Sequence, residues 1–203
     1  MKLLVKVACA AVLTIAFGAT ARAEPVGNTS AIIPAATQKA PQGTRSDLKL
    51  RDEVIRNAEL ATAENGALEV TFLDGSKLTM GENSRLTVDE YVYTGPGGTG
   101  KQTIRYTKGL FRFISGSIPK DQVKIETPTV TIGIRGTDFK YAANEDGSGA
   151  ISIDYGPNGE KHEIVVTKKK DGEKIVLESG QMVTYDTNGD FGQIGGGQIQ
   201  GCQ

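Results

Sequence analysis

Apolar and polar residues alternate along most of the chain from Leu48 onward. The alternation runs through 68–72 and resumes at 78–80, and Asp74-Gly75 lies between these two segments. A period of two buries one face of a β-strand, and an Asp-Gly pair favours a tight turn, so the two segments predict a hairpin. Further alternating segments lie at 86–88, 91–93, 104–106, 111–113, 123–125, 130–139, 151–155, 164–166, 175–177 and 183–185.

Glycine-containing turns separate the later segments. The dipeptides are Asp146-Gly147, Asn158-Gly159, Asp171-Gly172 and Asn188-Gly189. Many short strands joined by such turns predict an all-β fold, either an antiparallel sandwich or a barrel, and nothing indicates alternating β and α units. Segment 48–63 is ambiguous, because Leu50, Val54, Ala58 and Ala61 also have helical spacing.

The first 23 residues have the three parts of a secretory signal peptide. Lys2 and Lys6 supply positive charge, 7–17 is an apolar run, and Ala21-Arg22-Ala23 is a small-x-small cleavage site. An uncleaved anchor is the weaker alternative, because a spanning helix needs about 20 apolar residues. We therefore expect export to the periplasm, with secretion beyond the outer membrane left open. The mature chain would begin at Glu24 and would have no stable membrane span.

Composition divides the rest of the chain into three parts. Residues 24–47 are rich in Ala, Pro, Thr, Gln and Gly, and they predict a flexible spacer or merely an unselected tail. Residues 48–187 carry the alternating pattern and predict one β domain. Residues 188–203 are rich in Gly and Gln with little to bury, and they predict a disordered tail.

The charge balance argues against nucleic-acid binding, and the cysteine content excludes a disulfide within the mature chain. Removing residues 1–23 takes away three of the 23 basic residues and no acid, which leaves 20 bases against 24 acids. Such a chain has no basic surplus for binding phosphates, so we expect no nucleic-acid partner. Cys202 is then the only cysteine, which excludes a disulfide within the mature chain and leaves an intermolecular disulfide or no role for this residue.

Short motifs in a fixed order resemble those of the FecR domain. They are Asp74-Gly75-Ser76, Gly81-Glu82-Asn83-Ser84, Thr127-Pro128, Arg135-Gly136-Thr137-Asp138-Phe139 and Gly180-Gln181. Together they extend over about 52–185. The resemblance implies a jelly-roll-like, all-β periplasmic domain, and it implies extended backbone over 54–62 in place of a helix. FecR-type regulators of iron uptake relay a signal from an outer-membrane receptor to a sigma factor, through a membrane helix and a cytoplasmic segment. We expect neither segment here, and so a stand-alone module without direct sigma-factor control.

Residues suited to catalysis are scarce. His162 is the only histidine and has charged neighbours, which is typical of a solvated strand end, and one histidine cannot form a typical zinc site. Cys202 lies in a glycine-rich tail without a nearby histidine, and 95–100 lacks the ending of a phosphate-binding loop. Asp186, Asn188 and Asp190 are better explained by a turn than by a calcium loop. We expect no enzyme activity, no metal and no cofactor.

The most informative local feature is Arg135-Gly136-Thr137-Asp138. An arginine that follows the apolar run 130–134 must pair with a carboxylate or reach solvent, and Gly136 indicates a bulge or bend. Arg135 could tie neighbouring strands together, through Asp74 for example. Alternatively, Arg135, Thr137 and Asp138 form a binding site for an anionic ligand or partner.

The other motif residues predict structural roles. Asp74-Gly75-Ser76 and Asn83-Ser84 read as turns. Thr127, Pro128, Gly136 and Phe139 belong to the same structural motif, and Lys168-Lys169-Lys170 reads as a solvated hairpin tip.

The predicted function is binding rather than chemistry. The leading hypothesis is a periplasmic binding or signalling module that presents its loops to an envelope protein. The alternative is a structural envelope or surface protein that binds polysaccharide or peptidoglycan. The absence of tryptophan weakens that alternative slightly, because sugar-binding platforms often use this residue.

Overall fold

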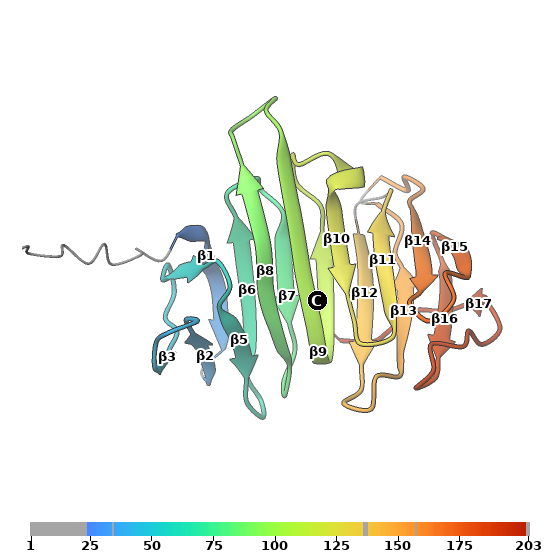
Figure 1. The fold of residues 1–203 in the computed structure, drawn as a ribbon, viewed down its shortest axis with the longest axis horizontal. Helices are drawn as coiled ribbons and strands as arrows, with labels where there is room; N and C mark the ends of the chain where they lie inside the picture. The colour runs from blue at the N-terminus through green and yellow to red at the C-terminus, as the bar shows by residue number, and fades with distance from the viewer. Residues whose placement is uncertain (1–23, 34, 136–137, 157, 202–203) are drawn as a thin grey trace, which may run out of the picture.

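The computed structural model describes residues 24–33, 35–135, 138–156 and 158–201. Its strands form two sheets that share the long strand β9 (Gly100–Ile114), as Figure 1 shows. Sheet I has the order β4 (Glu53–Ile55), β1 (Pro25–Ile33), β6 (Ala67–Phe72), β7 (Lys77–Met80), β9, β12 (Asp138–Ala143), β13 (Gly149–Ile153), β16 (Gln181–Tyr185) and β17 (Gly195–Gly196). Sheet II has the order β3 (Arg45–Asp47), β2 (Ala36–Lys39), β5 (Glu59–Thr62), β8 (Arg85–Tyr93), β9, β10 (Val123–Glu126), β11 (Val130–Ile134), β14 (Glu163–Lys168) and β15 (Lys174–Glu178).

The predicted all-β, antiparallel architecture is confirmed. Neighbouring strands are antiparallel except β9 and β10, which run parallel. One short 3-10 helix, η1 (Lys120–Gln122), precedes β10. The hairpin expected around Asp74-Gly75 is present, and it pairs Leu68 with Met80 across β6 and β7. Segment 48–63 contains the strands β4 and β5, so its extended reading is correct and its helical spacing is coincidental.

From β10 onward, successive strand pairs alternate between the two sheets. The pairs β6–β7, β12–β13 and β16–β17 belong to sheet I, whereas β10–β11 and β14–β15 belong to sheet II. Figure 1 shows the result, in which the chain advances along the long axis from β1–β5 at one end to β14–β17 at the other. The later strands therefore lie far from the earliest ones.

Strand β9 changes sheet at Gly109. Residues before it pair with β8 in sheet II, and residues after it pair with β7 and β12 in sheet I. Gly109 has a φ of 111°, and a Cβ at this position would lie 2.4 Å from the Cα of Ser84. Only glycine combines this backbone conformation with so close an approach.

The core lies between the two sheets and contains the apolar residues of the alternating segments. At its centre Tyr106, Phe111, Tyr141 and Tyr185 stack, with 4.1 Å between the ring centroids of Tyr106 and Phe111. The hydroxyl groups of Tyr141 and Tyr185 contact each other in the interior. Burial raises the pKa of Tyr141 to about 12, because the phenolate form would lose its hydration.

The N-terminal segment differs from the prediction of a flexible spacer over 24–47. It forms β1, β2 and β3, and β1 pairs with both β4 and β6. Val26 and Thr29 are fully buried there, although the surrounding composition is polar. A register shift between Thr29 and Ala31 breaks the period of two, so the usual alternation is missing from the sequence.

The C-terminal segment also differs from the predicted disorder over 188–203. Phe191 forms a bridge with Tyr185, β17 pairs with β16, and the backbone N–H of Ile199 donates to Ser152 Oγ at 3.1 Å. Backbone hydrogen bonds therefore hold this glycine-rich segment where apolar side chains are few. The signal-peptide prediction and Cys202 lie outside the described residues. Within the described ranges, no helix has the length and apolar character needed to cross a membrane.

Candidate functional site

Arg135 lies at the end of β11, on the outer surface of sheet II. Its side chain is 68% exposed, and its guanidinium donates to Glu163 Oε1 of β14 at 2.9 Å. The backbone N–H of Arg135 also donates to the carbonyl of Glu163 at 3.0 Å. Arg135 therefore pairs with Glu163 and not with Asp74, the partner that the sequence analysis considered.

Asp138 lies in the other sheet, where it begins β12. Its carboxylate accepts two hydrogen bonds from Arg112 of β9, at 3.0 Å from Nε and 2.7 Å from Nη2. The Asp138 side chain is only 10% exposed. Gly136 and Thr137 lie outside the described residues. Arg135 and Asp138 therefore do not face one ligand together, and the bidentate pair with Arg112 anchors the start of β12.

Asp74 is the centre of a buried polar network at the turn between β6 and β7. Its Oδ1 accepts from the Ser76 hydroxyl at 2.6 Å, the Ser76 N–H at 3.2 Å and the Tyr91 hydroxyl at 3.1 Å. Tyr91 in turn accepts the backbone N–H of Asp74 at 2.8 Å. Burial and the nearby Asp74 carboxylate raise the pKa of Tyr91. Because Asp74 is buried here, it is not available to an external ligand.

The remaining motif residues also make internal contacts. Asn83 has a φ of 52°, and Ser84 Oγ accepts the N–H of Leu110 at 3.1 Å, which braces the turn against β9. Thr127 Oγ1 accepts the N–H of Val130 at 2.9 Å in the turn that contains Pro128. Phe139 is buried in the core. These positions shape the scaffold.

Lys168 and Lys169 are not a solvated hairpin tip. Lys168 is buried and its ammonium group contacts Asp171, Glu173 and Asp190, which raises the pKa of Lys168. Lys169 Nζ donates to the carbonyl of Thr127 at 2.6 Å. Both lysines therefore connect the β14–β15 hairpin to neighbouring turns.

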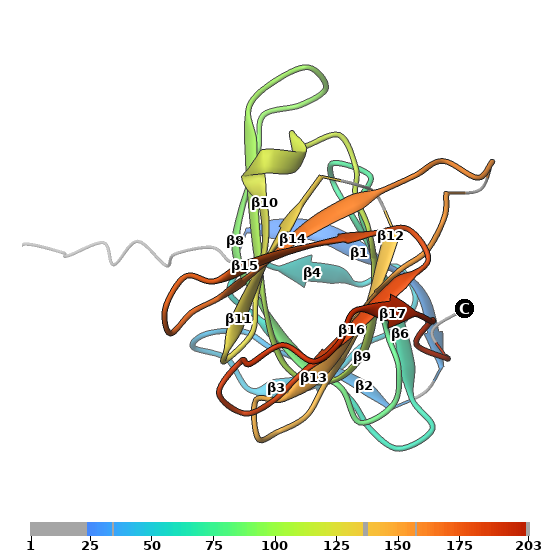
Figure 2. The same cartoon turned by 90° about the vertical axis from the view of Figure 1, so that its right-hand side faces the viewer.

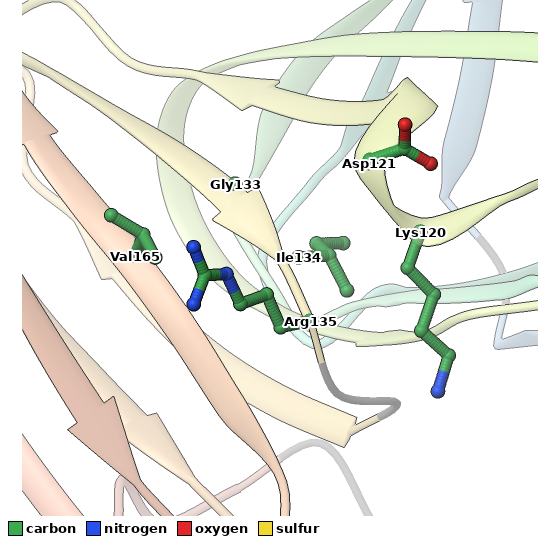
Figure 3. Close-up of a pocket in the computed structure, with 6 residues that line it drawn as sticks. All are labelled: Lys120, Asp121, Gly133, Ile134, Arg135 and Val165. Atoms are coloured by element: carbon green, nitrogen blue, oxygen red, sulfur yellow. The ribbon is translucent and has the colours of Figure 1, made fainter.

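A groove on the outer surface of sheet II begins at Arg135. It has a volume of about 480 Å³ and is lined by Lys120, Asp121, Gly133, Ile134, Arg135 and Val165. Gly133 and Val165 lie opposite each other on β11 and β14 and form its floor. Figure 3 shows the Arg135 side chain directed toward the strand of Val165, with Lys120 and Asp121 on η1 across the groove. The groove thus combines an apolar floor with charged margins.

Gly133 leaves its part of the floor of this groove without a side chain. A Cβ at this position would have only the Val165 carbonyl nearby, at 3.8 Å. Packing therefore does not require a glycine at position 133. Glycine inside a β-branched stretch is a sequence signal for a bare patch of backbone, and it would have pointed to the groove. Lys120, Asp121 and Val165 carry no comparable signal.

A second groove continues from Arg135 in the other direction along β14. Its lining residues are Arg135, Lys161, His162, Glu163 and Glu178. Arg135 is common to both grooves and is therefore the central residue of this surface. Within the described ranges, no group of three or more His, Cys, Asp and Glu side chains is arranged to hold a metal ion.

Comparison with known proteins relates one segment of the chain to a family. Residues 58–156 match the family model described as FecR protein. This segment is a FecR domain. No curated protein matches the chain. Among solved structures, the chain is similar to a "putative anti-sigma factor" from Parabacteroides distasonis, with a TM-score of 0.52 and 15% identity over 69% of this chain. The chain spans about 60% of that protein, and at this identity the likeness concerns the fold alone.

The FecR domain supplies only part of the Arg135 surface. Lys120, Gly133 and Arg135 lie within the matched residues, whereas Glu163 and Val165 belong to β14, beyond residue 156. Both grooves therefore depend on the contact between the FecR domain and the following hairpin. The Asp74 network, by contrast, lies wholly inside the FecR domain.

Proposed function

We propose that this chain is a non-enzymatic periplasmic module that binds a protein partner through the two grooves that meet at Arg135. The observation that carries the proposal is the exposed Arg135 guanidinium, which Glu163 holds between an apolar floor and charged margins. Protein interfaces often combine a small apolar area with an arginine and a polar rim. The FecR assignment and the fold shared with an anti-sigma factor support a role in regulation.

The chemistry of the grooves defines the partner. Lys120, Arg135 and Lys161 line the two grooves from different elements. An acidic side chain of the partner could displace Glu163 from Arg135 or share the guanidinium with it, since five N–H donors are available there. An adjacent apolar side chain would cover Gly133 and Val165. The module then recognises a protein segment that carries an acidic residue beside an apolar one.

The experiment is crosslinking in living cells, followed by a pull-down from envelope fractions. Arg135→Ala removes the central cation, and Gly133→Val fills the groove at a position where a side chain fits the strand. Arg56→Ala is the matched control, because Arg56 forms a similar exposed pair with Glu24 at the opposite end of the molecule. We expect both groove variants to lose one specific protein that the control retains.

Two results would contradict the proposal. One is recovery of the same protein by all three variants, and the other is recovery of glycan or peptidoglycan alone. Far-UV circular dichroism of each purified variant separates these results from misfolding. The export step has its own test, which is the N-terminal sequence of the protein from the periplasmic fraction. A start at Glu24 is expected.

A further inference from the structure

Strand β15 is the most open edge of the molecule. In the described part of the chain, β3, β4, β15 and β17 each pair on one side only. Strands β3 and β4 have three residues each, β17 has two glycines, and β3 is polar and fully exposed. Strand β15 has five residues, Lys-Ile-Val-Leu-Glu, with an apolar centre. Natural edges are usually shortened or interrupted, and this one is not.

The hydrogen-bonding groups of alternate β15 residues face outward. Just before β15 the carbonyl of Glu173 accepts the N–H of Lys168, and just after it the N–H of Ser179 donates to the carbonyl of His162. The hydrogen bonds from β15 toward β14 therefore involve the odd-numbered residues of β15. In an antiparallel ladder the residues in between direct N–H and C=O to the opposite side. Lys174, Val176 and Glu178 therefore present these groups along the free edge. Figure 2, which views this end of the molecule, shows β15 in the foreground.

The sequence of β15 is complementary to itself in the antiparallel direction. With Val176 opposite Val176 of a second copy, Lys174 lies opposite Glu178, and Ile175 opposite Leu177. The outward groups of Val176 then form a hydrogen-bonded pair, and each end of the strand gains a cross-strand ion pair. Among the described residues, the ion pairs at this end join Arg135 with Glu163 and Lys168 with its acidic neighbours. Lys174 and Glu178 take part in none of these pairs and are left for the second copy.

The geometry points to a symmetric dimer in which β15 of two copies pair antiparallel about a two-fold axis at Val176, so that the two copies of sheet II become one continuous sheet. Pairing covers Val176, which is 46% exposed, and the half-buried Ile175. The N–H of Glu178 now donates to Gln181 Oε1 at 2.8 Å, and in the dimer it exchanges this partner for the carbonyl of Lys174. The interface is self-complementary, as a two-fold axis requires.

The dimer also joins the binding surfaces of the two copies. Gly133, Val165 and Val176 form one row across β11, β14 and β15. The two-fold axis continues that row into the second copy, so both apolar floors lie on one face of the extended sheet. Glu178 belongs both to the edge contact and to the lining of the second groove, whereas Arg135 does not take part in the edge contact. Dimerisation of the purified protein can therefore be measured without a groove ligand.

The test is sedimentation velocity of the purified protein over a range of concentrations, with a reductant present so that Cys202 cannot form a disulfide. The variants are Lys174→Glu, Glu178→Lys and the double reversal of both. Each single reversal places like charges opposite each other at both ends, and should raise the dimer dissociation constant about tenfold. The double reversal restores opposite charges and should restore dimerisation.

Val176→Pro is a second test of the edge. It removes an N–H that faces the second copy and not β14, so the monomer keeps its ladder while the central pair is lost. We expect a monomer with an unchanged circular dichroism spectrum. A wild-type monomer at all concentrations would overturn the proposal. So would a dimer that both single charge reversals leave unaffected, because such a dimer would use another surface.

Discussion

Replacing Asp74 with alanine removes the carboxylate on which the β6–β7 turn depends. Asp74 is 5% exposed, and its carboxylate accepts hydrogen bonds from the Ser76 hydroxyl and N–H and from the Tyr91 hydroxyl. The N–H of Ile118 also approaches its Oδ2, at 3.4 Å. After substitution, these donors remain in the interior and lose their acceptor. Ser76 and Tyr91 are themselves buried, so water does not readily replace the lost acceptor.

The magnitude follows from the number and type of these bonds. A hydrogen bond to a charged group contributes about 1.5–3 kcal/mol to stability. Ser76 Oγ can turn toward Gln102 Oε1 at 3.5 Å, which recovers a part of the loss. We therefore expect Asp74→Ala to lower the free energy of unfolding by about 3–5 kcal/mol, a large share of the total stability of a domain.

The assay is urea unfolding followed by far-UV circular dichroism and tyrosine fluorescence, since the chain has no tryptophan. Asp89→Ala is the matched control, because Asp89 pairs with Arg105 at the surface at 2.9 Å and should change stability by less than about 1 kcal/mol. Tyr91→Phe combined with Asp74→Ala should lower stability by less than the sum of the single effects. The reasoning is refuted if Asp74→Ala costs no more than Asp89→Ala.

Three further predictions concern the scaffold. Gly109→Ala should lower stability by more than about 1 kcal/mol in urea unfolding, because its Cβ would overlap Ser84 at a positive φ, and equal stability would contradict the required bend. Asp138→Asn breaks a partly buried bidentate pair and should cost about 1–3 kcal/mol by thermal unfolding, and no change would make the pair dispensable. Burial raises the pKa values of Tyr141 and Tyr185, so the contribution of these two groups to stability should be constant below about pH 10 and fall above it. Absorbance at alkaline pH should then show these tyrosines ionising only as the protein unfolds, and ionisation in the folded state would contradict their burial.

Local signals were sufficient to predict most strands and turns between 67 and 185. The alternation of 68–72 and 78–80 around Asp74-Gly75 encodes the β6–β7 hairpin, because the turn chemistry and the buried face agree. The β1 strand lacks such agreement. It pairs with β4 over its first residues and with β6 on its other edge over most of its length, and the buried Thr29 breaks the apolar pattern at the register shift.

The candidate site could be predicted only in part for a similar reason. Arg135 was recognisable because a charge follows an apolar strand. Its partner Glu163 is 28 residues away, and Lys168 contacts Asp190 at a separation of 22 residues. Contacts between residues so far apart in sequence depend on the order of the strands in the sheets. The alternation of apolar and polar residues does not encode this order. The grooves have the same origin, since Gly133 and Val165 meet only when β11 pairs with β14.

The alternation of strand pairs between the sheets has a consequence for synthesis. Among the described residues, Gly27 and Phe72 are the strand-paired residues farthest apart in sequence, so a chain that emerges from its N-terminus can add each hairpin to strands already in place. No early strand must wait for a partner from the far end of the sequence. The central strand β9 would complete the bridge between the sheets midway, and later hairpins would extend a preformed template. The strand that is added last to sheet II is β15, so the growing end of the template is also the open edge of the finished molecule.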